Sequence, residues 1–318
     1  MRAIPLLTLL LGGWFVVPAH ADEAQNWLTR LGQAEQQQSF HGTFVYERNG
    51  SFSTHNIWHR VQDGKVRERL LQLDGSAQEV VRIDGRTQCV SGILIAGLGD
   101  SPSSAARALD PQKLKNWYDL AVIGKSRVAG RAAVIVSLTP RDQHRYGFEL
   151  HLDKETGLPL KSLLLNERGQ LLERFQFTQL DTADLPSDSD LQPSADCKTI
   201  ALDSDKASAT KSAQVWRSDW LPPGFELTSS TSRKDPETKT QVNSLMYDDG
   251  LARFSVFLEP LNGATITDTR TQLGPTVAVS RRLTTPQGEM MVTVVGEIPI
   301  GTAERIALSM RSDATATK

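Results

Sequence analysis

Two different spacings of apolar residues divide the first half of the chain. Residues 24–38 place Trp27, Leu28 and Leu31 on one stripe at three- and four-residue spacing, which predicts an amphipathic helix. From residue 40 onward, apolar and polar residues alternate one by one, and this period is typical of half-buried strands. The helix therefore needs a sheet to pack on, and the sheet follows it directly.

Asn-Gly and Asp-Gly dipeptides interrupt the alternation at residues 49, 63, 74 and 84. Such dipeptides favour two-residue hairpin turns, and short loops force neighbouring strands to run antiparallel. The pattern predicts five strands, at residues 40–48, 52–61, 66–73, 79–83 and 87–90. They form a meander.

The next segment predicts a second helix and a second set of strands. Asp110 precedes a proline, as at a capped helix start, and we place a helix at residues 111–120. Strands are predicted at residues 128–138, 146–152, 160–165 and 171–180. A sheet of about nine or ten twisted strands curls strongly, so we expect a half-barrel wrapped around helical segments.

The apolar pattern is lost at residues 191–213, where Ser, Asp, Ala and Lys predominate, and this composition predicts a linker. Residues 214–318 then predict a small α+β domain, with a closing helix capped by Thr302. Its strands are expected at residues 242–247, 252–258, 277–283 and 290–297. The predicted fold class is α+β: a large curved antiparallel half-barrel plugged by helices, residues 22–190, plus this small domain.

The start of the chain predicts export. Arg2 is followed by an apolar stretch and by the small residues Ala19 and Ala21, so residues 1–21 are interpreted as a cleavable secretory signal. A retained membrane anchor is the alternative, but the stretch is short for a bilayer and Pro18 interrupts it. We expect the mature chain to work in the periplasm.

Composition and cysteines agree with a globular exported protein. The net charge of -2 and the 23% of charged residues indicate an ordinary globular chain with no nucleic-acid partner. The two cysteines, Cys89 and Cys197, form a disulfide in one interpretation and stay two unpaired thiols in the other.

Catalytic and metal-binding patterns are missing from the sequence. His55 and His59 lie four residues apart on a predicted strand, a span of about 13 Å, which is too long for one metal ion. We interpret them as polar residues on an exposed sheet face. Neither a Gly-x-Ser-x-Gly elbow nor a phosphate-binding loop occurs. The sequence predicts a binding protein without cofactor or metal, and a hydrolase is the disfavoured alternative.

Apolar side chains in two places suggest a lipid ligand. An apolar segment with glycines at its end, residues 93–99, follows the meander. We interpret it as a lid or as the lining of a binding-site mouth, and one more buried strand is the alternative. Aromatic residues expected to point into the half-barrel would complete the site, or else form ordinary core. The candidate lipid-contacting residues are Phe44, Tyr46, Phe52, Trp58, Ile93, Leu94, Ile95 and Leu98.

Several motifs in the same order resemble the MucB/RseB family across nearly the whole mature chain. They include residues 42–46 (GTFVY), 145–153 (RYGFELHLD), 221–225 (LPPGF) and 247–252 (YDDGLA). The resemblance implies a periplasmic regulator of a sigma-E-type envelope stress response, not an enzyme. It also implies a large domain like the lipoprotein carriers LolA and LolB.

The resemblance implies partners as well. Family members bind the periplasmic segment of a membrane anti-sigma factor of MucA/RseA type, shield it from a DegS-type protease, and release it when lipid or a lipopolysaccharide fragment binds. We expect the strand at residues 253–258, together with the cleft between the two domains, to contact this segment. Its candidate contact residues are Arg253, Phe254, Val256 and Leu258. A LolA-type lipid carrier without a signalling role is the alternative, and assembly into a homo-oligomer stays open.

Overall fold

The computed structural model describes residues 19–76, 78–91, 109–199, 215–234, 240–264, 266–286 and 288–313. The first 18 residues of the predicted signal lie outside these ranges. So do four candidate lipid contacts, Ile93, Leu94, Ile95 and Leu98. Within the described ranges, every helix is too short or too polar to cross a membrane.

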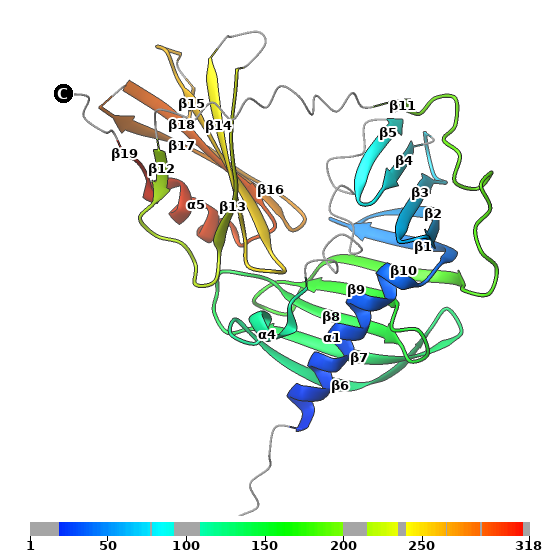
Figure 1. The fold of residues 1–318 in the computed structure, drawn as a ribbon. Coiled ribbons are helices and arrows are strands. Elements are labelled where there is room, and N and C mark those ends of the chain that lie inside the picture. The colour runs from blue at the N-terminus through cyan, green and yellow to red at the C-terminus, as the bar shows by residue number, and fades with distance from the viewer. Residues whose placement is uncertain are drawn as a thin grey trace, which may run out of the picture.

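One large antiparallel sheet forms the first domain (Figure 1). In the described part of the chain its 11 strands follow the order β11-β5-β4-β3-β2-β1-β10-β9-β8-β7-β6. The strands are β1 (Phe40–Arg48), β2 (Ser51–Gln62), β3 (Lys65–Gln72), β4 (Gln78–Ile83), β5 (Arg86–Ser91), β6 (Tyr118–Val128), β7 (Arg131–Pro140), β8 (Gly147–Asp153), β9 (Pro159–Leu165), β10 (Leu171–Asp181) and β11 (Lys198–Thr199). The predicted meander is confirmed.

The hairpin turns have the expected backbone. Asn49, Asp63 and Asp84 each have φ near +50°, and each is followed by a glycine with positive φ. Two successive residues with positive φ match the right-handed twist of the flanking strands. The Asn-Gly and Asp-Gly dipeptides therefore determine where these strands begin and end.

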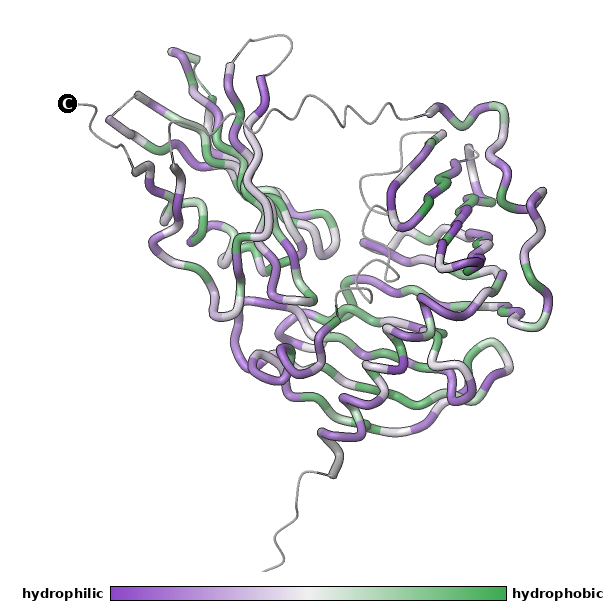
Figure 2. Tube along the Cα trace, in the orientation of Figure 1, coloured by the Kyte–Doolittle hydropathy of each residue, from purple (hydrophilic) through white to green (hydrophobic). Residues whose placement is uncertain are grey.

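Helix α1 (Ala19–Gln37) lies across one face of the curled sheet (Figure 1). Its residues Leu28 and Leu31 pack into a core with β6, β7 and β8, while Ala34 joins a second core with β1, β2 and β10. Figure 2 shows apolar positions alternating with polar ones along the strands, as a sheet with one covered face requires. The half-barrel plugged by a helix is confirmed.

The predicted helix at residues 111–120 is wrong beyond its first turn. Helix α4 (Pro111–Leu114) is capped as expected, because Asp110 accepts a hydrogen bond of 2.9 Å from the backbone N–H of Gln112. The chain then enters β6 at Tyr118 and turns at residues 129–130, inside the predicted strand 128–138. Pairing between β6 and β7 overrides the helical spacing, since it satisfies the backbone of both strands.

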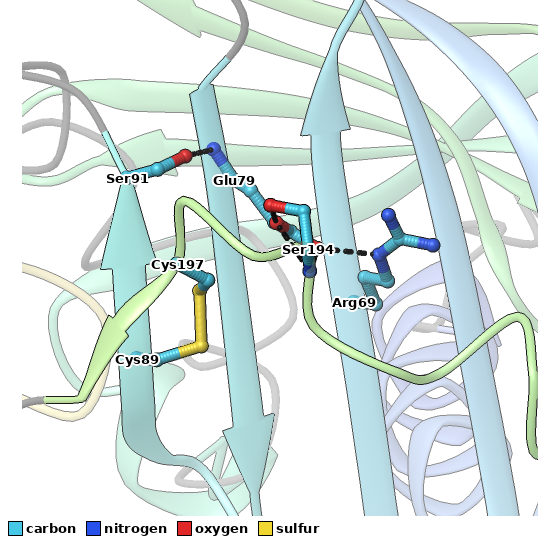
Figure 3. The surroundings of a disulfide bond; sticks show 6 residues. All are labelled: Arg69, Glu79, Cys89, Ser91, Ser194 and Cys197. Atoms are coloured by element: carbon cyan, nitrogen blue, oxygen red, sulfur yellow. Dashed lines mark hydrogen bonds and ion pairs between the residues drawn. A yellow bond between two sulfur atoms is a disulfide. The ribbon is translucent and has the colours of Figure 1, made fainter.

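Residues 188–199 contact β2 to β5 on the outer face of the sheet, the face opposite α1. Arg60 of β2 donates to Asp188, Arg69 of β3 donates to the carbonyl of Asp190, and Figure 3 shows Ser194 beside Glu79 of β4 and Cys197 beside Cys89 of β5. Glu79 accepts hydrogen bonds from Arg69 (2.6 Å) and from the backbone N–H of Ser194, and Cys197 is joined to Cys89 in a disulfide. The disulfide joins two cysteines that are 108 residues apart in the sequence. The first nine residues of the expected linker, 191–199, are thus packed against the large sheet.

The small domain is a second antiparallel sheet with one helix (Figure 1). Its six described strands follow the order β13-β14-β15-β18-β17-β16, and a two-stranded ribbon pairs the domain's ends. The elements are β12 (Val215–Ser218), β13 (Glu226–Lys234), β14 (Gln241–Asp248), β15 (Arg253–Pro260), β16 (Thr269–Leu273), β17 (Thr276–Thr285), β18 (Gly288–Gly296), α5 (Ile300–Ser309) and β19 (Met310–Asp313). The small α+β domain is confirmed.

The start of α5 differs from the prediction. Pro299 occupies the N-cap position without a side-chain hydrogen bond, and Thr302 lies buried inside the first turn. The Thr302 hydroxyl instead contacts Nδ1 of His144 in the large domain at 3.1 Å. A threonine that looks like a cap in sequence therefore serves a contact between domains.

Candidate functional site

The face of the large sheet that α1 covers is called the inner face here. Strand register places Phe44 and Tyr46 on it, opposite Phe177 and Phe175 of β10. The rings of Phe44 and Phe175 lie 4.7 Å apart between centroids, and both side chains are buried. The inner face thus carries an aromatic row along β1 and β10.

Two of the four candidate aromatics do not point inward. Phe52 pairs with Glu47 and Trp58 with His41, and both pairs alternate onto the outer face. Phe52 is 64% exposed, and the Trp58 ring lies under the guanidinium of Arg69, 5.1 Å from the ring centroid. The expectation of four inward aromatics is wrong for Phe52 and Trp58, because the register of β2 places His55, Ile57 and His59 on the inner face instead.

His55 and His59 also lie on the inner face, and the expectation of an exposed face is wrong. Each side chain is 1% exposed, and the rings stack on Phe44 and Phe40 at 5.1 and 4.8 Å. Burial lowers the pKa of His55 to about 4, because the charged imidazolium would lose its hydration there. His55 is therefore neutral at physiological pH.

A buried ionic group continues from His59. Its Nε2 contacts the backbone carbonyl of Glu35 in α1 at 2.9 Å, and its Nδ1 lies 3.4 Å from Glu68. Arg82 donates to the other oxygen of Glu68 at 2.8 Å. Burial alone would raise the pKa of Glu68, but His59 and Arg82 outweigh it and lower that pKa to about 2. Among the described residues, no group of His, Cys, Asp and Glu is arranged to hold a metal ion.

The two domains meet at a buried ion pair, called the Arg145 junction here. The Arg145 guanidinium donates to Asp249 of the small domain, and both side chains are fully buried. It also donates to the carbonyl of Pro223 at 2.6 Å and to its own neighbour Asp142 at 2.9 Å. Burial raises the pKa of Asp249, while two backbone N–H donors and Arg145 offset part of that rise.

Close packing fixes the same junction. Gly224 has φ of +87°, and a Cβ at this position would lie 2.2 Å from the indole of Trp117. Only glycine allows the backbone of the small domain to approach the ring so closely. The Leu-Pro-Pro-Gly-Phe turn is thus a docking element, with Phe225 5.1 Å from the Arg145 guanidinium.

A second contact between domains starts from the end of β1. Arg48 donates to Glu297 at 3.1 Å and to the hydroxyl of Thr276, both in the small domain. Within the large domain, Tyr46 donates to Glu173 at 2.6 Å. Burial raises the pKa of Glu173, and Tyr46 and Arg48 offset part of that rise. The aromatic row of the inner face therefore ends in a polar group that reaches the small domain.

The predicted partner-binding strand is an internal one. Strand β15 lies between β14 and β18, and Phe254, Val256 and Leu258 are 1%, 0% and 0% exposed in the core of the small domain. Arg253 alone of the four reaches the surface, where its Nε lies 2.9 Å from Asp248. The prediction is wrong for the three buried side chains, since they present no surface to a partner.

Sequence reasoning also missed residues that the junction uses. Arg145 and Asp249 stand inside the motifs RYGFELHLD and YDDGLA, and neither motif by itself indicates an ion pair. Their positions 104 residues apart gave no hint of a shared ion pair. The available signal is that both motifs stand next to predicted turns, where functional residues are concentrated.

Two family models cover most of the chain. Residues 23–195 match the MucB/RseB N-terminal domain, and residues 210–311 match the MucB/RseB C-terminal domain. The chain belongs to the MucB/RseB family. This is a family of regulators rather than of enzymes.

Relatives within the MucB/RseB family match over most or all of their length. The sigma factor AlgU regulatory protein MucB of Pseudomonas aeruginosa is 62% identical over 100% of both chains. The sigma-E factor regulatory protein RseB of Escherichia coli is 29% identical over 89% of both chains.

Solved structures of family members include a MucA/MucB complex and a crystal structure of MucB. The complex of P. aeruginosa MucA and MucB matches with a TM-score of 0.79 at 62% identity, over 92% of this chain and 100% of that chain. A crystal structure of MucB matches with a TM-score of 0.69 at 59% identity, over 92% of this chain and 98% of that chain. The two solved structures thus differ in how well this chain superposes on them.

Proposed function

We propose that this protein is a periplasmic negative regulator of a sigma factor of AlgU/sigma-E type. It binds the periplasmic segment of a MucA/RseA-type anti-sigma factor, protects that segment from regulated proteolysis, and releases it when a lipid or lipopolysaccharide binds. The observation that carries the proposal is the full-length match to MucB, at 62% identity, together with the MucA-bound structure of that relative.

The second domain supports a regulator over a carrier. A carrier of LolA type needs a concave sheet with a helix, which the first domain supplies by itself. Here a second domain with its own buried core is docked onto the first through a fully buried ion pair. Burying two charges costs free energy unless the geometry of the ion pair is complete. A simple carrier has no need for a second domain that is docked in this way.

The inner face supports a lipid as the releasing signal. Its aromatic row, with Phe44 and Phe175 in contact, is apolar, as a site for an acyl chain requires, but both rings are buried in a core that includes Ala34 of α1, so an acyl chain can reach them only if α1 moves. The lipid must bind two conformations of the protein with different affinities, since a ligand shifts an equilibrium only by the difference in its affinity for the two states. The lipid must therefore favour the conformation that holds the anti-sigma segment less tightly.

The test uses the mature chain, residues 22–318, and the periplasmic segment of a MucA-type anti-sigma factor. Calorimetry should show binding, a DegS-type protease should cleave the bound segment more slowly than the free one, and added lipopolysaccharide should restore cleavage. The matched control is serum albumin, which binds lipid but has no reason to protect the segment. Lipid binding without capture of the segment would favour the carrier, and neither activity would refute both readings.

A further inference from the structure

The inner face is joined to the small domain by a row of side chains on neighbouring strands. Register pairs Tyr46 with Phe175 and Arg48 with Glu173, and alternation puts all four on the inner face. Phe44 precedes Tyr46 in the same row. The aromatic surface proposed for lipid therefore runs directly into a tyrosine, a carboxylate and an arginine.

Arg48 lies between two carboxylates of different domains. Its Nη2 is 3.1 Å from Glu297 of the small domain, while its Nε is 3.8 Å from Glu173 of the large domain. The Tyr46 hydroxyl donates to the same oxygen of Glu173, at 2.6 Å. Tyr46 thus supplies the short hydrogen bond that Arg48 does not make to Glu173.

The turn between β16 and β17 rests on the stem of Arg48. A Cβ at Gly274 in this turn would lie 2.9 Å from Cγ of Arg48. Thr276, the first residue of β17, accepts a hydrogen bond from Arg48. A change in the Arg48 rotamer would therefore remove contacts to Thr276, Gly274 and Glu297 together.

The two contacts between domains differ in burial. Both side chains of the Arg145–Asp249 pair are fully buried, whereas those of the Arg48–Glu297 pair are 16% and 38% exposed. Partly exposed pairs are weaker and more easily exchanged than fully buried ones, and breaking a fully buried pair leaves a charge without solvent. Motion of the small domain should therefore open the Arg48 contact first and keep the Arg145 junction as its pivot.

We propose that Arg48 is a latch between the domains and that Tyr46 and Glu173 are positioning residues that set it. When a ligand fills the inner face and displaces Tyr46, the partly buried Glu173 loses its donor and takes Arg48 as a replacement. Arg48 then leaves Glu297 and Thr276, and the small domain is freed. This mechanism rests on the proposed function, because it describes how the lipid signal reaches the small domain.

Three variants of the mature chain test the latch. Tyr46→Phe keeps the ring but removes the donor, so amide hydrogen exchange at residues 273–276 should accelerate at least about ten-fold, the lower limit for one lost charge-assisted hydrogen bond. Arg48→Gln should accelerate exchange there to a similar extent. Glu173→Gln removes the competing carboxylate, so exchange should stay at the wild-type rate or slow down.

The double variant Tyr46→Phe/Glu173→Gln is decisive. If Tyr46 acts through Glu173, the double variant should behave like Glu173→Gln and lose the acceleration. A merely structural role of the tyrosine would leave the acceleration in place. Tyr146→Phe is the matched control, because the Tyr146 hydroxyl donates directly to the Ile298 carbonyl at 3.1 Å, and its effect should not respond to Glu173→Gln.

Lipopolysaccharide-induced release of the anti-sigma segment gives the second readout. Glu173→Gln should require at least several-fold more lipopolysaccharide for half-release, and Tyr46→Phe should require less. Release identical to wild type in both variants, with wild type responding normally, would overturn the latch. A wild-type protein that does not bind the segment would instead refute the proposed function, and the exchange measurements would still decide the latch.

Discussion

Replacing Arg145 by methionine removes the guanidinium that separates two carboxylates. Asp249 is fully buried, and Asp142 is 23% exposed. Without Arg145, these two like charges face each other in a site closed by Phe225 and the Pro223 carbonyl. Removing one partner of a buried ion pair costs about 3–5 kcal/mol.

Asp249→Asn is the matched variant, and it should cost less. The Arg145–Asp142 pair survives, and the asparagine oxygen can still accept from the backbone N–H groups of Leu251 and Ala252, as Asp249 does. The lost interaction is one charge-assisted hydrogen bond, worth about 1.5–3 kcal/mol. The two variants are therefore expected to differ although they disrupt the same pair.

The pH dependence of the loss has a defined sign. Burial raises the pKa of Asp249 in the folded protein, and losing Arg145 removes one of the influences that lower it. A carboxyl whose folded pKa exceeds its unfolded pKa binds more protons when folded, so the stability of Arg145→Met relative to wild type falls as pH rises through that interval. The loss should be smallest near pH 4 and largest at pH 7.

Urea unfolding followed by tryptophan fluorescence measures these differences at pH 4.5, 5.5 and 7. Circular dichroism on the same samples checks that each variant folds before urea is added. Equal losses for Arg145→Met and Asp249→Asn at pH 7 would contradict the charge argument. A loss in Arg145→Met that does not change with pH would contradict the assignment of buried charge to Asp249.

Three further outcomes are expected. Cys197→Ser should lower the free energy of unfolding by about 4–5 kcal/mol, because the bond to Cys89 closes a loop of 108 residues. A reductant should lower the free energy of unfolding of the wild type by the same amount and leave that of the variant unchanged. Gly224→Ala should loosen the junction and lower the midpoint of thermal unfolding, whereas Gly169→Ala, with similar φ and open space around it, should cost only the backbone strain. His55 should stay neutral from pH 8 to pH 5 in an NMR titration and protonate near pH 4, and because its folded pKa is lowered, stability should fall as pH drops below about 6.5.

Each of these outcomes has a contrary result. Unchanged stability after reduction of wild type would mean that the unfolded chain gains no freedom from losing the bond. Equal midpoints for the two glycine variants would mean that the indole is not packed against the turn in solution. A His55 that titrates near pH 6.5 would show that water reaches the inner face.

Local patterns in the sequence were sufficient for much of the fold. The turns at Asn49, Asp63 and Asp84 follow from residues that tolerate positive φ, so the strands of the meander could be placed to within a residue or two. The helix cap at Asp110 was also local and correct. Where pairing with the next strand competes with the helical spacing of single residues, as at β6 and β7, the helical preference lost.

The candidate site could not be predicted from the alternation of apolar and polar residues, because this alternation does not show which face of a strand is covered. Alternation shows that Phe52 and Trp58 share a face but not which face the helix covers, and it shows that Phe254 and Val256 share a face but not that β15 is internal. Strand order and sheet curvature decide both, because they result from pairing between residues far apart in sequence.

The sequence by itself determined the two sheets, the turns that bound their strands and the family to which the chain belongs, since these depend on short-range patterns and ordered motifs. Only the tertiary structure decided that Arg145 and Asp249 share a buried site and that Arg48 lies between carboxylates of two domains. The physical reason is that a charge can be buried only where a distant partner meets it. The sequence around a buried charged residue does not show where in the chain its partner lies.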